Sequence, residues 1–208
     1  MSSSAGIIII GDEILSGRTK DTNINWIANE LNEIGVRLKE ARVIEDDKKI
    51  IINTVLEFSK KFTYVFTSGG IGPTHDDITT ESIAAAFKVD LEKNKIAMNL
   101  LKKHYEKSNI DFNEARQKMA IIPKGASLIE NPVSVAPGFN IKNVYVFAGI
   151  PKIMQSMFHS ISSKLKGGII IKSKTITCDI GEGKIATDLS QIQNQFLLGL
   201  QQAQWCPD

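Results

Sequence analysis

The sequence predicts an α/β fold in which helices cover a mostly parallel sheet. Strand, helix, strand, helix and strand patterns alternate over residues 5–67, which is the order found in parallel sheets with crossover helices. The strand segments are short, nearly continuous apolar runs, as expected where both faces of a sheet are covered. The chain has 208 residues, of which 42% are apolar, and this is enough to bury a sizeable core.

The first five elements follow from apolar spacing and from helix-end signals. Helices are predicted where apolar residues recur every three or four positions, and strands where they alternate or run together. Thr22 and either Asp46 or Asp47 are candidate N-caps, and Gly35 lies just past the first helix. In order, we predict a strand at 5–10, a helix from 22 to 34, a strand at 36–44, a helix that includes 50–58, and a strand at 64–67.

The later elements alternate less regularly. Thr79 or Thr80 can cap a helix, and residues 92–107 predict a further one. Pro151 occupies the first turn of another helix, which we expect to close the main domain near Leu165. Short strands are predicted at 119–122, 127–130, 138–141 and 144–147.

The last part of the chain forms a predicted attachment. Residues 166–168, Lys-Gly-Gly, are a linker signal, and they precede a predicted strand at 169–178 and a predicted helix at 183–196. So short a segment cannot build a second core. We therefore expect one domain at 1–165 and an incomplete extension at 166–208.

Charge and cysteine content disfavour several classes of partner and site. The 25 basic and 23 acidic residues leave a net charge of +2, without the large basic field that makes duplex nucleic acid or an anionic membrane the default partner. Cys178 and Cys206 lack the Cys-x-x-Cys spacing of zinc or redox sites. Because the sequence has neither an uncharged apolar run of about 18 residues nor a basic, apolar leader, we expect a cytoplasmic protein.

A glycine-rich segment between a strand and a helix is the strongest functional signal. It runs over 67–79 and contains Gly69, Gly70 and Gly72. Glycines let the backbone approach an anion with its N–H groups exposed, and the N-terminus of the following helix adds partial positive charge. The segment matches neither the Walker A nor the Gly-x-Gly-x-x-Gly pattern. It predicts phosphate binding, and the alternative is a tight turn whose glycines only satisfy backbone geometry.

Carboxylates lie beside this predicted phosphate site. Asp76 and Asp77 would repel a phosphate unless a cation such as Mg²⁺ lies between them, so both are candidate metal ligands. The alternative role for both is charge complementarity at the start of the next helix. His75 lies within the segment and is a candidate phosphate contact.

The ends of the first two strands are expected at the same edge as this segment. Asp12, Glu13 and Ser16 follow the first strand, and Asp46 and Asp47 follow the second. Ligands of open parallel sheets bind at the carboxyl ends of the strands. We therefore predict that acidic groups from three successive strand ends converge, although each pair taken alone would be a solvated cap.

Three motifs resemble those of the MoaB/Mog molybdopterin-binding domain family, in its CinA-like branch. They are Gly-Asp-Glu-Ile-Leu-Ser-Gly at 11–17, Ser-Gly-Gly-Ile-Gly-Pro-Thr-His-Asp-Asp-Ile-Thr at 68–79, and Asn-Pro at 131–132 with Ala-Pro-Gly-Phe at 136–139. Their order and spacing match as well, and the likeness covers residues 6–165. The second motif is far more specific than a lone glycine-rich pattern.

The resemblance implies a fold, an assembly and a set of site residues. It implies a three-layer α/β/α sandwich that forms a homo-oligomer, a trimer or a dimer. It implies molybdopterin as a ligand, adenylylated from Mg-ATP, and it puts Asp77 and Asp46 in the catalytic positions. Together with the loop positions above, the candidate ligand-binding residues are Gly11, Asp12, Glu13, Ser16, Ser68, Gly69, Gly70, Gly72, Pro73, Thr74, His75, Pro137, Gly138, Gly149 and Pro151.

The same resemblance leaves alternative functions open. CinA-like members, and the related domain attached to FAD synthases, are associated with metal-dependent hydrolysis of ADP-ribose or FAD. A binding module without activity is the third interpretation. We place binding of a phosphorylated pterin or nucleotide first, narrowly, because it describes the pocket without requiring turnover.

The chain departs from the CinA-like pattern in two places. Residues 148–151 are Ala-Gly-Ile-Pro where Pro-Gly-x-Pro is usual, and Ile153 occurs in place of a following Glu. This loop therefore keeps its backbone glycine but lacks the acidic side chain, and any function of that Glu is not expected in this chain. The deamidase domain of full-length CinA is absent from this sequence. Deamidation of nicotinamide mononucleotide is therefore not expected.

Overall fold

The computed structural model describes residues 3–168, 170 and 181–195. The chain divides into two compact units, Met1–Ile171 and Lys172–Asp208. In the second unit, α8 spans Glu182–Gln195, where the sequence predicts a helix. The predicted strand at 169–178 lies outside the described residues, apart from residue 170. None of the helices in the described ranges is long and apolar enough to cross a membrane.

A six-stranded sheet forms the centre of the first unit, in the order β2-β1-β3-β8-β7-β6. The four strands from β2 to β8 are parallel, whereas β7 pairs antiparallel with both β8 and β6. The prediction of a mostly parallel sheet is therefore confirmed. The strand bounds are β1 Ser4–Ile10, β2 Arg37–Ile44, β3 Tyr64–Ser68, β6 Ser127–Ile129, β7 Gly138–Ile141 and β8 Val144–Phe147.

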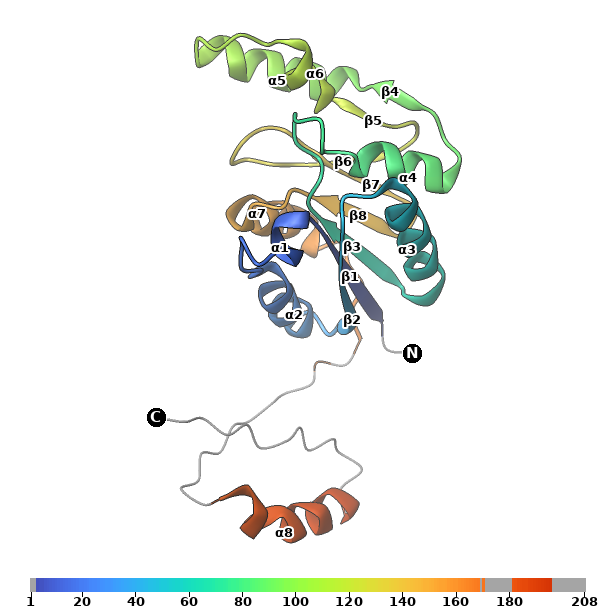
Figure 1. Ribbon diagram of the computed structural model, residues 1–208, viewed down its shortest axis with the longest axis vertical. Coiled ribbons are helices and arrows are strands. Elements are labelled where there is room, and N and C mark those ends of the chain that lie inside the picture. The colour runs from blue at the N-terminus through green and yellow to red at the C-terminus, as the bar shows by residue number, and fades with distance from the viewer. Residues whose placement is uncertain (1–2, 169, 171–180, 196–208) are drawn as a thin grey trace. The chain divides into compact units, whose positions relative to one another are not determined.

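Helices cover both faces of this sheet and make the three-layer sandwich that the family resemblance implies (Figure 1). On one face lie α2 (Asn23–Glu33) and α7 (Pro151–Ser162). On the other lie α3 (Lys48–Lys61) and α4 (Thr79–Phe87). Each helix contributes the apolar stripe that the sequence spacing predicts, and each layer has its own core.

Strand β1 separates the two cores by simple alternation. Ile7 and Ile9 belong to the core under α2 and α7, whereas Ile8 and Ile10 belong to the core under α3 and α4. Successive side chains of a strand point to opposite faces, so a central strand covered on both sides must be apolar throughout. This explains the unbroken isoleucine run at the start of the sequence.

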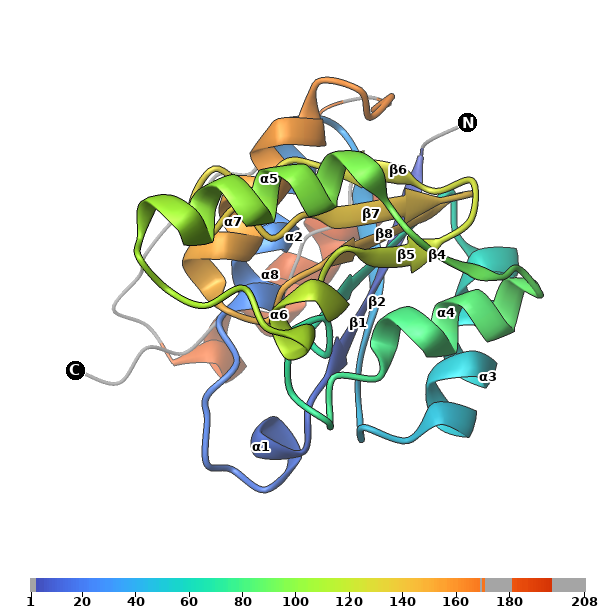
Figure 2. The ribbon, with the colours of Figure 1, turned by 90° about the horizontal axis from the view of Figure 1, so that it is seen from above.

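A small accessory region, residues 91–123, forms a layer of its own beside the sandwich (Figures 1 and 2). It has a small core made by Ala97, Leu101 and Ala120. Its strands β4 and β5 pair antiparallel. The element bounds are β4 Leu91–Lys93, α5 Lys95–Lys107, α6 Glu114–Lys118 and β5 Ile121–Pro123.

The accessory region corrects two predictions. The predicted helix at 92–107 begins too early, because residues 91–93 pair with β5 as a strand and Asn94 then caps α5 through its side chain. The predicted strand at 119–122 also begins too early, since Met119 and Ala120 still complete the turn that ends α6. Both boundaries depend on pairing between segments about 30 residues apart in the chain. The local propensity of either segment cannot predict this pairing.

Helix starts also differ from the prediction in detail. Asp47, rather than Asp46, caps α3, and its side chain accepts a hydrogen bond from Ile50 N at 2.9 Å. Thr22 stands at the N-cap position of α2, but the cap bond there comes from Asp21, whose carboxylate accepts from Ile24 N. Helix α4 begins at Thr79 itself, preceded by Ile78, which has no side-chain oxygen to act as a cap.

Candidate functional site

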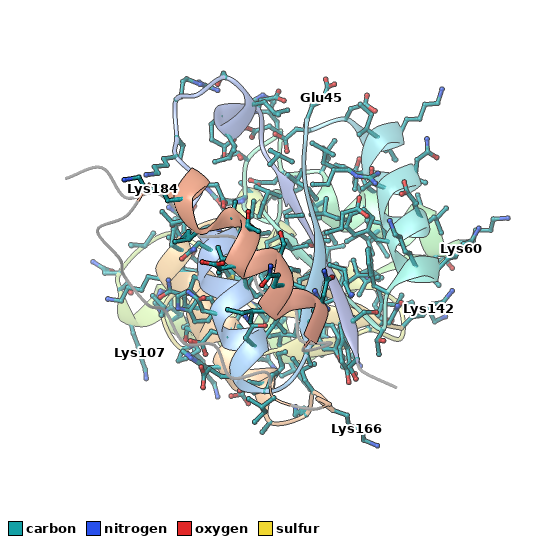
Figure 3. The ribbon with its side chains drawn as sticks, turned by 90° about the horizontal axis from the view of Figure 1, so that it is seen from below. Glu45, Lys60, Lys107, Lys142, Lys166 and Lys184 are labelled. Atoms are coloured by element: carbon teal, nitrogen blue, oxygen red, sulfur yellow. The ribbon has the colours of Figure 1, made fainter. Side chains whose placement is uncertain are left out.

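The predicted site residues lie in loops that leave the carboxyl edge of the sheet. Strands β1, β2, β3 and β8 all end at this edge because they are parallel. A one-turn helix that was not predicted, α1 (Asp12–Leu15), follows β1 directly. Figure 3 shows Glu45, from the loop after β2, at the same end of the molecule as α1, with Lys166 at the opposite end.

Gly69 is the point where three of these strand ends meet. Its φ is +114°, and a Cβ atom there would lie 2.1 Å from the carbonyl oxygen of Ile10, at the end of β1. A Cβ on Gly149, after β8, would lie 3.3 Å from the Cα atom of Gly69. Only glycine leaves space for this approach and adopts this φ without strain. The junction therefore depends on backbone packing, as one of the two sequence interpretations expects.

The three residues after this junction present free backbone donors. Among the described residues, the N–H groups of Gly70, Ile71 and Gly72 have no acceptor, whereas Gly69 N donates to Phe147 O at 3.1 Å. The carbonyl of Gly70 accepts from the first N–H of α4 at 2.9 Å. Successive unpaired N–H groups beside a helix N-terminus are the arrangement that binds anions. The geometry thus also fits the phosphate interpretation.

Asp77 closes the far side of the glycine-rich loop. Its carboxylate accepts a hydrogen bond from Thr74 N at 2.8 Å and a second from the Thr74 hydroxyl. A Cβ on Gly72 would lie 2.6 Å from the same carboxylate, so the loop folds directly over it. Asp77 is half-buried, whereas Pro73, Thr74, His75 and Asp76 are exposed.

Asp12 and Asp46 form a reciprocal pair across the ends of β1 and β2. Asp12 N donates to an Asp46 carboxylate oxygen at 3.0 Å, and Asp46 N lies 3.4 Å from an Asp12 carboxylate oxygen. Burial raises the pKa of Asp46 above its ordinary value, and the negative charges of Asp12, Glu13 and Asp76 raise it further, although the bond from Asp12 N opposes them. Negative charges from the loops after β1 and β3 therefore act on Asp46 in the loop after β2, as expected if acidic groups from three strand ends converge.

The carboxylates can be compared with the needs of a divalent cation. No three His, Cys, Asp or Glu side chains in the part of the chain that the structure describes are arranged to hold a metal ion by themselves. Mg²⁺ in phosphate sites is usually held by one or two carboxylates, with phosphate oxygens and water as its other ligands. The hard oxygens of Asp12 and Asp46 fit such an ion, shared with a bound phosphate, better than an all-protein cage.

Some candidate residues have evident structural roles. Gly138 begins β7 beside the end of β8, and a Cβ there would lie 2.3 Å from the carbonyl oxygen of Val146, so sheet packing explains this glycine. Pro137 precedes it and is buried. Pro151 is the first residue of α7, as predicted, and is exposed. Ser16 ends α1, and its hydroxyl accepts a hydrogen bond from the Arg18 side chain at 3.2 Å.

Sequence reasoning missed Asn23, the first residue of α2. Its side-chain amide donates to Ser68 Oγ at 2.9 Å and to the carbonyl oxygen of Gly149 at 2.8 Å. It is 4% exposed, and its Oδ1 has no partner within the described residues. Asn23 therefore ties α2 to the ends of β3 and β8 beside the glycine junction. An asparagine on the otherwise apolar buried face of a predicted helix was the available signal.

A hollow lies in the accessory region, away from the predicted site residues. Its volume is about 740 Å³, and its lining comes from α5, from the segment that joins α5 to α6, and from Gln117. Tyr105 and Phe112 stack beside it, with ring centroids 5.6 Å apart. None of the residues that line this hollow is among the predicted site residues.

Comparisons with curated proteins identify relatives from archaea. A protein of Sulfurisphaera tokodaii is 39% identical over 165 residues, which is 77% of this chain and 63% of the relative. A protein of Pyrococcus abyssi is 34% identical over 205 residues, which is 92% of this chain and 81% of the relative. The chain thus spans about 63% of the length of the first of these relatives.

Comparisons with solved structures identify the same fold. The protein CinA with unknown function from Thermoplasma acidophilum has a TM-score of 0.72 and 34% identity, and the match covers 78% of this chain and 98% of that one. The molybdopterin biosynthesis enzyme MoaB from Thermus thermophilus has a TM-score of 0.53 at 15% identity, over 78% of this chain and 91% of that one, which shows the fold alone. The model of the family described as "Probable molybdopterin binding domain" matches residues 6–166, so the chain belongs to this molybdopterin-binding family.

Proposed function

We propose that this chain binds a phosphorylated pterin or nucleotide at the carboxyl edge of its sheet. The three N–H groups of residues 70–72, which have no acceptor within the described residues, carry the proposal because they lie beside the N-terminus of α4. Membership of the molybdopterin-binding family supports a pterin as the organic part of the ligand. The carboxylates of Asp12 and Asp46 would hold a divalent cation against the phosphate, and the predicted metal ligands Asp76 and Asp77 would supply a further carboxylate to it from the turn that follows the glycine-rich loop.

The proposed reaction is transfer or hydrolysis at phosphorus. A divalent cation, when bound, supplies charge neutralisation at the phosphoryl oxygens. The loop N–H groups would hold the phosphate and stabilise the charge that develops on it. Asp77 would keep the loop closed over the phosphate through its bonds to Thr74. For adenylyl transfer the nucleophile is the terminal phosphate of the pterin, and for hydrolysis it is water.

Calorimetry tests the binding proposal. Titration of molybdopterin or a pterin phosphate into the protein with Mg²⁺ should show saturable binding. Asp46→Asn should weaken it about tenfold or more, because loss of a charge-assisted contact is worth about 1.5 kcal/mol or more. Asp47→Asn is the matched control, since asparagine also caps helices and this residue acts at the start of α3. A wild-type protein without measurable binding would refute the proposal.

A second candidate function is hydrolysis of a nucleotide pyrophosphate such as ADP-ribose or FAD. The half-buried carboxylate of Asp46, which Asp12 N holds at 3.0 Å, favours it, because a carboxylate fixed at this edge would accept a proton from the attacking water, and adenylyl transfer requires no such proton. Similarity to CinA supports the same branch of the family. Incubation with either substrate and Mg²⁺ should release AMP, and Asp77→Asn should abolish the release. If neither substrate yields AMP, this candidate fails. If the protein then binds the pterin without turnover, the interpretation that remains is a binding module without activity.

We also propose that the protein is a cytoplasmic homo-oligomer, a trimer or a dimer. Family resemblance supports the assembly, and the lack of an apolar helix long enough to cross a membrane, within the described ranges, is consistent with the compartment. Light scattering coupled to size-exclusion chromatography should give two or three times the chain mass of 22.9 kDa. A single-chain mass would contradict the proposal.

A further inference from the structure

Lys118, the last residue of α6, reaches from the accessory region to the turn that holds Asp77. Its ammonium group donates to the backbone carbonyl oxygens of Thr74 at 2.8 Å and of Asp77 at 2.9 Å. These partners lie 44 and 41 residues earlier in the chain. The side chain is half-buried, so the two charge-assisted bonds are less exposed to water than those of an ordinary surface lysine.

The accessory region holds Lys118 in place from both sides. Before it, the Asn113 side chain caps α6 by accepting from Arg116 N at 3.0 Å. After it, Ala120 is fully buried in the core of the accessory region. Strand β5 then packs against α4, the helix that begins just after the Asp77 turn. Lys118 therefore belongs to a region that packs against α4, next to the turn that the lysine binds.

The turn at residues 74–77 is consequently held in two ways. The carboxylate of Asp77 binds the Thr74 N–H and hydroxyl, while the ammonium of Lys118 binds the carbonyl oxygens of the same two residues. With both carbonyls engaged, the Thr74–His75 and Asp77–Ile78 peptide groups, at the two ends of the turn, have one preferred orientation, and Asp77 N donates to the same Thr74 carbonyl at 3.4 Å. That orientation sets where the Asp76 and Asp77 carboxylates lie relative to the glycine loop.

We propose that Lys118 is a positioning residue for these carboxylates and that the accessory region thereby contributes to the site. The proposal rests on the proposed function of the carboxylates. Lys118 acts through the turn, since its ammonium is engaged by two backbone carbonyls. Loss of the ammonium leaves both carbonyls without that partner and allows the turn to take other conformations. The binding loop would then be formed only part of the time, which lowers activity without unfolding the domain.

Three variants test this. Lys118→Met keeps a long apolar side chain but removes the ammonium, and Lys118→Arg keeps the positive charge. Lys124→Met is the matched control, because Lys124 is an exposed lysine just after β5 whose side chain has no hydrogen bond or ion pair within the described residues. Hydrogen exchange of peptides that cover residues 70–80 should be about tenfold faster in Lys118→Met than in the wild type. Lys118→Arg should restore most of the protection, and the control should match the wild type.

Kinetics separate positioning from general stability. For whichever substrate the wild type turns over, Lys118→Met should lower kcat/KM about tenfold or more, with a Tm close to that of the control and with recovery in Lys118→Arg. Unchanged exchange over 70–80 would overturn the proposal, and so would faster exchange with unchanged kcat/KM. If the wild type neither binds nor turns over any tested phosphate compound, the proposed function fails. The exchange measurement still decides whether Lys118 holds the turn.

Discussion

Replacement of Gly69 by alanine should destabilise the protein far more than the same change at Gly17. Both glycines have positive φ, but Gly17, at +73° and with no described atom within 4 Å of an added Cβ, would bear only the left-handed backbone term of about 1 kcal/mol. At Gly69 the new Cβ would also lie 2.1 Å from Ile10 O, whereas real Cβ atoms essentially never come closer than 3.0 Å. The two atoms must therefore separate by at least 0.9 Å.

That separation is difficult because Ile10 ends a strand that is paired on both sides and is itself 2% exposed. Overpacking of this kind adds about 1–3 kcal/mol, so we expect Gly69→Ala to lose about 2 kcal/mol more than Gly17→Ala. Urea unfolding followed by circular dichroism measures the difference as a shift of about 1 M in the midpoint, with m-values of about 1–3 kcal/mol/M. Equal losses in the two variants would refute the claim that the strand ends meet at Gly69.

Three further predictions concern single residues of the site. Because the pKa of Asp46 is raised in the folded state above the ordinary 3.8, the native protein binds more protons than the unfolded chain just above that pH, and stability falls as the pH rises through this window. Asp46→Asn should therefore be more stable than the wild type at pH 7 and show no advantage below pH 3.8, as measured by urea unfolding at both pH values. Asn23→Ala removes the donor for the buried Ser68 hydroxyl and for the carbonyl of Gly149 and should lower the free energy of unfolding by about 2 kcal/mol, with a lowered Tm in calorimetry. Gly72→Ala meets only the movable carboxylate of Asp77, so it should change Tm by only a few degrees yet weaken the binding of inorganic pyrophosphate, and unchanged affinity would argue against a phosphate at this loop.

The parallel half of the fold could be predicted because its signals are local. The isoleucine run of β1 and the helical spacing of α2 each identify an element without reference to another segment. The accessory region could not be predicted in the same way. Strand β4 has three exposed residues, and only its pairing with β5 makes it a strand. Helix α6 has five residues and depends on its cap at Asn113.

The same distinction between local signals and long-range contacts applies to the candidate site. Topology alone places the loops after β1, β2 and β3 at one edge, so the acidic residues there could be expected to lie together. The residue pattern alone could not separate Asp46 from Asp47, because both are aspartates at a helix start. Only the family resemblance pointed to Asp46, and packing makes Asp47 the cap and Asp46 the partner of Asp12. Lys118 could not be identified from the sequence either, because the carbonyl groups that it binds lie more than 40 residues earlier in the chain.

The small net charge of +2 conceals an uneven distribution that bears on how ligands would bind. Carboxylates gather at the carboxyl edge, where the charges of neighbouring groups raise the pKa of Asp46, while Lys142 and Lys166 lie toward the opposite end of the first unit (Figure 3). A phosphate that arrives alone meets the negative charge of these carboxylates, and a cation that arrives alone lacks the phosphate oxygens that would complete its coordination. Each ligand supplies the charge that the other needs. The two should therefore bind cooperatively, and thermodynamic linkage requires the cation to raise phosphate affinity by the same factor as phosphate raises cation affinity.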